Sequence, residues 1–179
     1  MKRYKPLFNE DITQDQTQTP EFKKWFGHSK VVKNGKPLIV YHGTKSNFSV
    51  FKPSNKMGNQ GEIDQLEGMY FTDSIDGASF YALDDSPKFL KKVYLSIQKP
   101  FMAKTYNELK EIFKIEDITE IGRIIKKKGY DGIFIEKGFY SNGGPWKLFL
   151  AFYPKQIKSA TDNTGNFSKN SDNINESII

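Results

Sequence analysis

Two short motifs and one further tyrosine carry side chains that could hold a ribose and a flat cationic ring. The first motif, residues 41–44, has the sequence YHGT and contains His42. The second motif, residues 68–73, contains Tyr70, and Tyr81 follows it along the chain. An imidazole can bond a hydroxyl group, and aromatic rings attract a planar cation. We therefore expect these three rings to converge on one ligand.

Each of these residues also has a simpler interpretation. A single histidine such as His42 is more often a surface or core residue than a ligand contact. Gly43 lacks a Cβ, so its backbone can approach a planar ligand closely. Thr44 could bond the ligand or cap a turn. Tyr70 and Tyr81 could enclose a ring, with each stacking contact worth about 1 kcal/mol, or they could fill the core.

The predicted elements place these residues on two strands and one helix. Residues 34 and 35 (NG) form a strong turn signal, after which residues 37–42 are expected to form a strand ending at His42. Residues 69–72 predict a strand carrying Tyr70, and a helix from residue 73 or 74 to about residue 84 would carry Tyr81. The other predicted elements are helices at 21–26, 106–113 and 118–128 and strands at 91–97, 133–135 and 148–153. This mixture indicates an α+β fold.

Length and composition limit the possible classes of protein. The 179 residues support one domain: a polar N-terminal extension at 1–19, the domain at 20–162 and a flexible tail at 163–179. There is no cysteine, and the two histidines are too few for a multi-histidine metal site. No stretch is apolar for long enough to span a bilayer, so we expect a cytoplasmic protein without a membrane partner.

The net charge of +6 permits an anionic partner, either a small molecule or a nucleic acid. Lysines alternate with acidic residues along most of the chain, and only residues 126–128 form a basic cluster. The basic residues do not form a stripe interleaved with exposed aromatic residues, which argues against a nucleic-acid-binding protein.

Three separated blocks, residues 22–32, 35–44 and 152–163, resemble in this order the ADP-ribosyltransferase domain of the polyvalent proteins of phages and other mobile elements. Residues 68–73 together with Tyr81 are similar to the donor site of poly(ADP-ribose) polymerases and diphtheria-type toxins. The resemblance implies a split β-sandwich of two small sheets, with NAD bound as the substrate in the cleft between them and no metal.

The same resemblance implies a role for each site residue. His42 would bond a ribose hydroxyl, Gly43 would contact the nicotinamide amide, and Thr44 would lie on the adenosine side. Tyr70 and Tyr81 would flank the nicotinamide ring. Breaking the bond between nicotinamide and ribose passes through a transition state with oxocarbenium character, so the site must hold the donor bent and away from water.

The chain departs from the wider superfamily where a catalytic glutamate is expected, because this position falls on Leu148. Leucine cannot polarise an acceptor. Some mammalian relatives with His, Tyr and an aliphatic residue resemble this arrangement and transfer a single ADP-ribose unit, which implies mono-transfer with the acceptor supplying its own base. Gln156 is a candidate catalytic residue, since its amide could bond a ribose hydroxyl or an acceptor; alternatively it satisfies backbone groups at a strand end. Three carboxylates could compensate but are expected on the solvated surface, namely Glu62, Glu67 and Glu136.

These observations predict an NAD-dependent mono-ADP-ribosyltransferase that modifies a host protein or nucleic acid, acts in the host cytoplasm as a phage or mobile-element effector, and is a monomer. The alternative is a binding module that retains the pocket for NAD or ADP-ribose but not turnover. Loop 137–147 is expected to recognise the acceptor, through Phe139, Tyr140 and Trp146.

Overall fold

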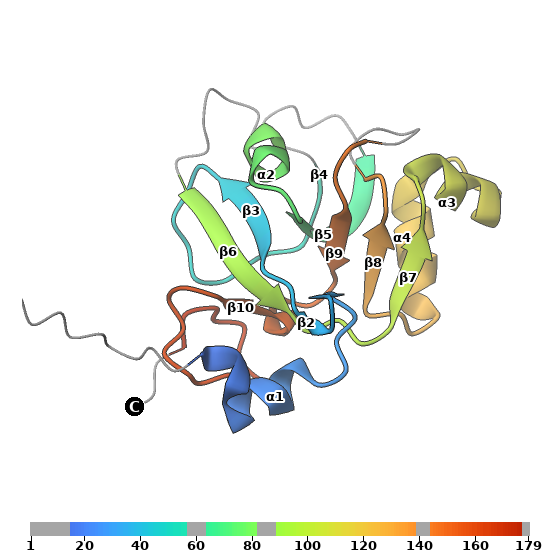
Figure 1. Cartoon of the computed structure of the whole chain (residues 1–179). Coiled ribbons are helices and arrows are strands. Elements are labelled where there is room, and N and C mark those ends of the chain that lie inside the picture. The colour runs from blue at the N-terminus through green and yellow to red at the C-terminus, as the bar shows by residue number, and fades with distance from the viewer. Residues whose placement is uncertain (1–14, 57–63, 82–88, 139–143, 177–179) are drawn as a thin grey trace, which may run out of the picture.

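The computed structural model describes residues 15–56, 64–81, 89–138 and 144–176, and these form an α+β domain (Figure 1). Its α-helices are α1 (Pro20–Phe26), α2 (Ile75–Tyr81), α3 (Tyr106–Phe113) and α4 (Ile118–Lys127). Its strands are β1 (Val32–Lys33), β2 (Lys36–Pro37), β3 (Val40–Thr44), β4 (Ser54–Lys56), β5 (Asp64–Thr72), β6 (Phe89–Leu95), β7 (Pro100–Ala103), β8 (Gly132–Ile135), β9 (Leu148–Ala151) and β10 (Ile157–Ser159). Single 3₁₀ turns occupy Gln16–Gln18 and Pro154–Gln156.

The main sheet is mixed and is divided near its centre. Its strand order is β10-β6-β3-β5-β9-β8-β7, with β4 paired to β5, and only β7 and β8 run parallel. Strands β3 and β6 share five residue pairs, whereas β3 and β5 share one, Tyr41 with Thr72. The α+β class and the split sheet are therefore confirmed. The two halves remain joined through this single pair, and β1 and β2 form a separate hairpin.

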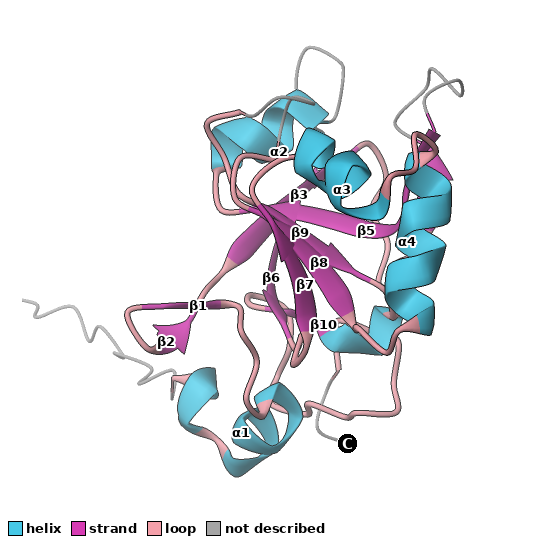
Figure 2. Ribbon diagram, turned by 90° about the vertical axis from the view of Figure 1, so that its right-hand side faces the viewer, coloured by secondary structure: helices cyan, strands magenta, loops and turns pink. Residues whose placement is uncertain are grey.

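Two apolar clusters hold the halves of the sheet. The first joins both halves, since it contains Val40 and Val93 from one side of the split and Phe71 and Phe149 from the other. The second lies where α3 and α4 cover β5, β8 and β9 (Figure 2). Gly122 lets α4 approach β5 closely, because a Cβ there would lie 3.2 Å from the side chain of Leu66.

A third cluster is aromatic and fixes α1 against β6. It contains Phe22, Trp25 and Phe26 from the helix and Tyr94 from β6. Thr19 caps the helix by accepting a hydrogen bond from the backbone of Phe22, and Pro20 occupies the first helical position, where no intrahelical donor is needed. The helix predicted at 21–26 is therefore present, and its apolar residues pack rather than face a ligand.

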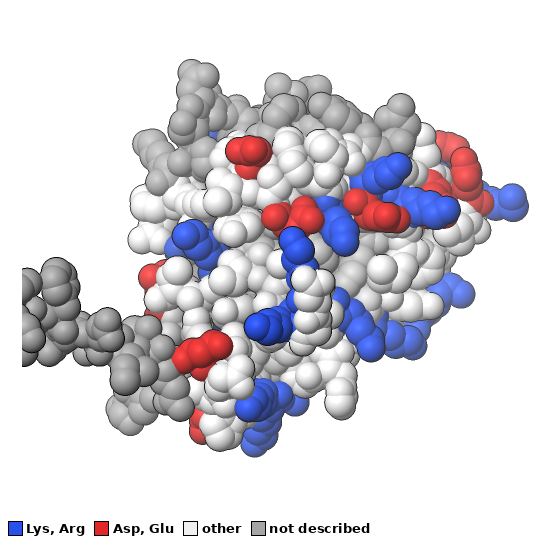
Figure 3. All heavy atoms as spheres, in the orientation of Figure 1, with Lys and Arg blue, Asp and Glu red and all other residues white. Residues whose placement is uncertain are grey.

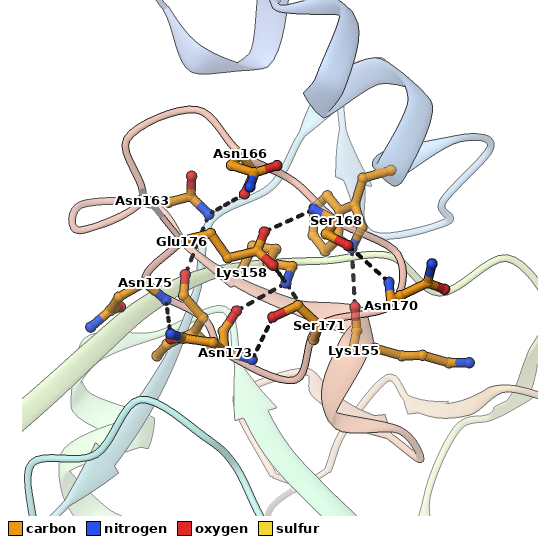
Figure 4. Close-up of polar contacts among 12 residues, drawn as sticks. Lys155, Lys158, Asn163, Asn166, Ser168, Asn170, Ser171, Asn173, Asn175 and Glu176 are labelled. Atoms are coloured by element: carbon orange, nitrogen blue, oxygen red, sulfur yellow. Dashed lines mark hydrogen bonds and ion pairs between the residues drawn. The ribbon is translucent and has the colours of Figure 1, made fainter. Parts of the chain in front are cut away.

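The C-terminal segment corrects one prediction. Its composition of Asn, Ser and Gly predicts a flexible tail from residue 163, yet residues 163–176 pack on the domain (Figure 4). Phe167 joins the aromatic cluster, and Ile174 is fully buried in the first cluster. The buried ammonium of Lys158 lies 2.9 Å from the Glu176 carboxylate and donates to the carbonyls of Ser171 and Asn173. The composition does not reveal this packing, because only a few apolar side chains and one buried ion pair hold the segment on the domain.

Candidate functional site

His42 lies where the two halves of the sheet separate. Tyr41 makes the one pair between β3 and β5, and the next residue along β3 is His42. Its Nδ1 lies 2.8 Å from the carbonyl oxygen of Tyr70. A carbonyl oxygen can only accept, so Nδ1 carries the proton and Nε2 presents a lone pair. The imidazole thus bonds a strand carbonyl just beyond the last pair of the ladder.

The surroundings of His42 keep the imidazole neutral. Its ring packs against the rings of Phe51 and Phe71, with centroids 5.0 and 5.6 Å away. Loss of hydration in this apolar setting lowers the pKa of His42; the bond to the Tyr70 carbonyl opposes this shift, and the nearby Lys91 charge adds to it. His42 nevertheless remains partly accessible to solvent. A neutral ring with a fixed tautomer can accept a hydrogen bond at Nε2.

Tyr70 directs its ring away from that of His42. Successive residues of a strand point to opposite faces, and the His42 ring packs on Phe71. Tyr70 instead packs against the second apolar cluster, where its hydroxyl donates to the carbonyl of Leu66. The structure therefore links His42 and Tyr70 through the Tyr70 backbone, and their two rings lie on opposite faces of β5 rather than facing each other.

The remaining residues of the two motifs lie beside this junction. Gly43 is half-buried on β3, in register with Leu90 of β6. The Thr44 hydroxyl accepts a hydrogen bond from the Ser46 backbone at 3.2 Å, which is a turn-capping contact. Helix α2 packs beside β3 and ends at Tyr81, whose side chain lies outside the part of the chain that the structure describes.

Two contacts that the sequence did not reveal fix α2 and the end of the loop before β9. The Asp73 carboxylate accepts a hydrogen bond from the Lys147 backbone at 3.0 Å. A Cβ at Gly77 would lie 3.0 Å from the Trp146 indole and 3.0 Å from the Thr72 hydroxyl, so the indole lies directly over this glycine. Trp146 was predicted to recognise an acceptor, and here it packs on α2. Phe139 and Tyr140 lie outside the described residues.

Leu148 begins β9 and is almost fully buried, with 1% of its surface exposed. It pairs with Thr72 on one side and Ile135 on the other. Each of these partners is followed in sequence by an exposed carboxylate, Asp73 and Glu136. Of the other carboxylates considered from the sequence, Glu67 is exposed and Glu62 lies outside the described residues.

Gln156 lies at the opposite end of the strands from His42 and forms a complete set of backbone contacts. Its Oε1 accepts from the backbone nitrogens of Phe152 and Tyr153, at 3.1 and 2.8 Å. Its Nε2 donates to the carbonyls of Ser96 and Asp131, at 3.2 and 2.9 Å. The amide has no donor left for a ligand, so Gln156 ties β9, β6 and β8 together and does not join the site at His42.

Within the described residues, no group of three or more His, Asp or Glu side chains could hold a metal ion. No helix in the same part of the chain is long and apolar enough to cross a membrane.

The fold and the junction at His42 define the class of protein as an α+β domain with a split mixed sheet of the ADP-ribosyltransferase type. The family model described as ADP-ribosyltransferase in polyvalent proteins matches residues 33–167, and the chain belongs to this family. The match includes both motifs and the Leu148 position. Comparisons with curated proteins and with solved structures gave no match.

Proposed function

We propose that the protein is an NAD-dependent mono-ADP-ribosyltransferase whose donor binds at the β3 and β5 split. The observation that carries this proposal is the neutral His42 imidazole, held by the Tyr70 carbonyl at 2.8 Å with Nε2 available as an acceptor. Ribose hydroxyls are donors, and an acceptor beside the glycine of residues 41–44 can orient the sugar while the backbone meets the planar amide. Membership of the family supports NAD as the donor.

Each residue of the proposed donor site has one role. His42 holds the ribose through Nε2, and the backbone of Gly43 contacts the nicotinamide amide. Tyr81 flanks the ring from the end of α2. Tyr70 contributes its backbone carbonyl, which holds the His42 imidazole, because its own ring lies on the other face of β5. As the nicotinamide bond lengthens, positive charge moves from the ring to the ribose, so an enclosed apolar site with few charges favours departure of neutral nicotinamide.

The acceptor supplies its own base in this proposal, because Leu148 has no group that can take the proton of the attacking nucleophile. Glu136 is a candidate to assist, since it follows a register partner of Leu148 and is exposed. We expect transfer of one unit without elongation. The acceptor is a host protein or nucleic acid, and the protein acts as a monomeric phage or mobile-element effector in the host cytoplasm.

The buried aliphatic side chain of Leu148 also favours a second candidate, a module that binds NAD or ADP-ribose without turnover. Both candidates share the donor site and differ in nicotinamide release.

The test is to incubate the purified protein with NAD labelled in the adenylate portion and with host lysate, and to measure both label transfer and nicotinamide release. The chain has a matched control, because His28 is its other histidine and is exposed. We expect His42→Ala to abolish transfer and His28→Ala to leave it intact. NAD binding without release would select the binding module. Transfer that survives His42→Ala would overturn the site.

A further inference from the structure

A cavity opens beside the start of β9, and His42 does not line it. It has a volume of about 620 Å³ and lies between the β1 and β2 hairpin and the strands β7, β8 and β9. This volume is in the range of sites that bind a small molecule or a peptide side chain cluster. None of the proposed donor residues on β3 or α2 lines it, whereas Leu148, at the expected glutamate position, and Glu136 do.

Lysines and carboxylates both line the cavity. Four exposed lysines line it, and no ion pair joins any of them to another described residue: Lys30, Lys33, Lys104 and Lys147. Three carboxylates also line it, and two of them accept backbone hydrogen bonds, Glu108 from Lys104 and Asp73 from Lys147. The lysines exceed the carboxylates by one charge, so the lining favours a partner with a small excess of negative charge.

Two aliphatic side chains of the lining are exposed. Met102 from β7 is 64% exposed and Val32 from β1 is 42% exposed, and both line the cavity. The two aromatic rings of the lining, Phe134 and Phe149, are 7% and 5% exposed, so they offer no platform on which bases could stack. An adaptable methionine beside a valine suits an aliphatic side chain better than a nucleobase.

The face around this cavity also lacks the charge pattern of a nucleic-acid surface. Figure 3 shows Lys and Arg side chains mixed with Asp and Glu across the face that carries the hairpin and β7, rather than a single basic stripe. A protein segment with acidic and aliphatic residues matches such a mixed rim, whereas a polyphosphate backbone requires a continuous basic track.

The cavity adjoins the proposed donor site through one pair of strands. Asp73 and Leu148 line the cavity, and Thr72, the residue before Asp73, pairs with Leu148. A segment bound in the cavity would therefore run past the place where β5, α2 and β9 meet.

We propose that this cavity, lined by Lys33, Lys104, Met102 and Val32, seats an acidic peptide segment with an aliphatic residue, belonging to the protein acceptor. This inference rests on the proposed function, and it makes a protein rather than a nucleic acid the acceptor. The segment places an aliphatic side chain against Met102 and Val32 while its carboxylates meet the exposed lysines.

Binding is tested with a short fluorescein-labelled peptide that carries one leucine between glutamates, measured by fluorescence anisotropy. Its lysine-for-glutamate counterpart and a single-stranded oligo-dT are the comparison probes. We expect the acidic peptide to bind the wild type best. The variant Lys33→Glu/Lys104→Glu should weaken this binding at least tenfold, about 1.4 kcal/mol. The control Lys127→Glu/Lys128→Glu, at the exposed end of α4, changes net charge equally and should not.

Met102→Glu should weaken binding in the same way, and Ile112→Glu, at a 52% exposed position on α3, is its control. Equal effects of the pocket and control variants, no binding of the acidic peptide, or tighter binding of oligo-dT would each overturn the inference. NAD binding, measured separately, should be unchanged in the pocket variants. If the wild type does not bind NAD, the proposed function is refuted, whatever the peptide result.

Discussion

The Nδ1 atom of His42 lies 2.8 Å from the carbonyl oxygen of Tyr70 and joins the two halves of the sheet at the point where they separate. One side chain thereby has two tasks: Nδ1 donates to the fold, and Nε2 stays available for a ligand. Substitutions can separate these tasks, because an asparagine amide can replace Nδ1 as a donor but has no atom at the place of Nε2.

His42→Ala should lower the free energy of unfolding by about 1–3 kcal/mol, because it leaves a partly buried carbonyl without its donor. His42→Asn should recover part of this stability and still bind NAD poorly. Urea denaturation and NAD titration of the two variants, with His28→Ala alongside, check both statements. Equal loss of stability in the two variants would show that the Nδ1 bond contributes little.

The lowered pKa of His42 predicts how stability depends on pH. The unfolded chain, with an ordinary histidine pKa near 6.5, binds a proton more readily than the folded protein does. The contribution of His42 is therefore fully present above this pH and is lost as the pH falls through 6.5 toward the folded pKa. Denaturation midpoints between pH 7.5 and 5 should fall less steeply in His42→Asn than in the wild type and in His28→Asn. Parallel pH profiles would contradict this account.

The ion pair between Lys158 and Glu176 should contribute strongly to the free energy that holds residues 163–176 on the domain. Glu176→Gln leaves a buried ammonium without its counter-ion and should cost about 3–5 kcal/mol. The exposed pair of Lys110 and Glu116 is the control, and Glu116→Gln should cost at most about 1 kcal/mol. Thermal and urea unfolding measure both, and a small effect of Glu176→Gln would show that the apolar anchors alone hold the segment.

The same segment should influence the His42 site. The backbone of Ile174 donates to the carbonyl of Ser49 at 2.8 Å, and Val50 and Asn173 form an isolated bridge. These contacts hold the turn whose Phe51 ring packs on His42. We expect Glu176→Gln to increase proteolysis near residues 45–53, and limited proteolysis followed by mass spectrometry reads this out. Cleavage confined to the C-terminal segment would contradict the coupling.

Gly77→Ala should weaken NAD binding without unfolding the protein. Alanine favours the helix by about 1 kcal/mol, but its methyl group would lie 3.0 Å from the Trp146 indole and displace either the indole or α2. The double variant Gly77→Ala/Trp146→Ala should restore part of the binding, because the clash is relieved. Titration of NAD into both variants tests this, and equal weakening in the double variant would show that Trp146 does not set the position of α2.

Gln156→Leu should lower stability without changing the NAD dissociation constant. It leaves two part-buried carbonyls and two backbone nitrogens without their Gln156 partner, and an unpaired group that is fully buried costs roughly 1–3 kcal/mol. The comparison of urea midpoints with NAD affinity at low temperature separates the two effects. A weakened NAD affinity in protein that is still folded would return Gln156 to the site.

Local signals in the sequence predict much of this fold. The Asn34 and Gly35 turn, with positive φ at both residues, and the helices at 106–113 and 118–127 follow from turn and amphipathic patterns. The family blocks predict the split sheet, which periodicity alone does not, because pairing between β3 and β5 depends on contacts distant in sequence.

The site shows where such reasoning ends. The motifs identify His42 and Tyr70 by residue type, but the faces of their rings depend on strand register, which is fixed by packing across the sheet. A glutamine amide such as that of Gln156 can bond a ligand or backbone groups equally well. Only the positions of its four backbone partners show that Gln156 has the structural role. The contact of Gly77 with Trp146 joins segments about seventy residues apart and has no local signal.

The most direct test of the central claim is calorimetric titration of NAD into the wild type, His42→Asn and His28→Asn. The proposal that NAD binds at the split beside His42 predicts saturable binding by the wild type and by His28→Asn, and at least a tenfold higher dissociation constant for His42→Asn. Equal affinity in all three proteins, or no binding by a folded wild type, would contradict it.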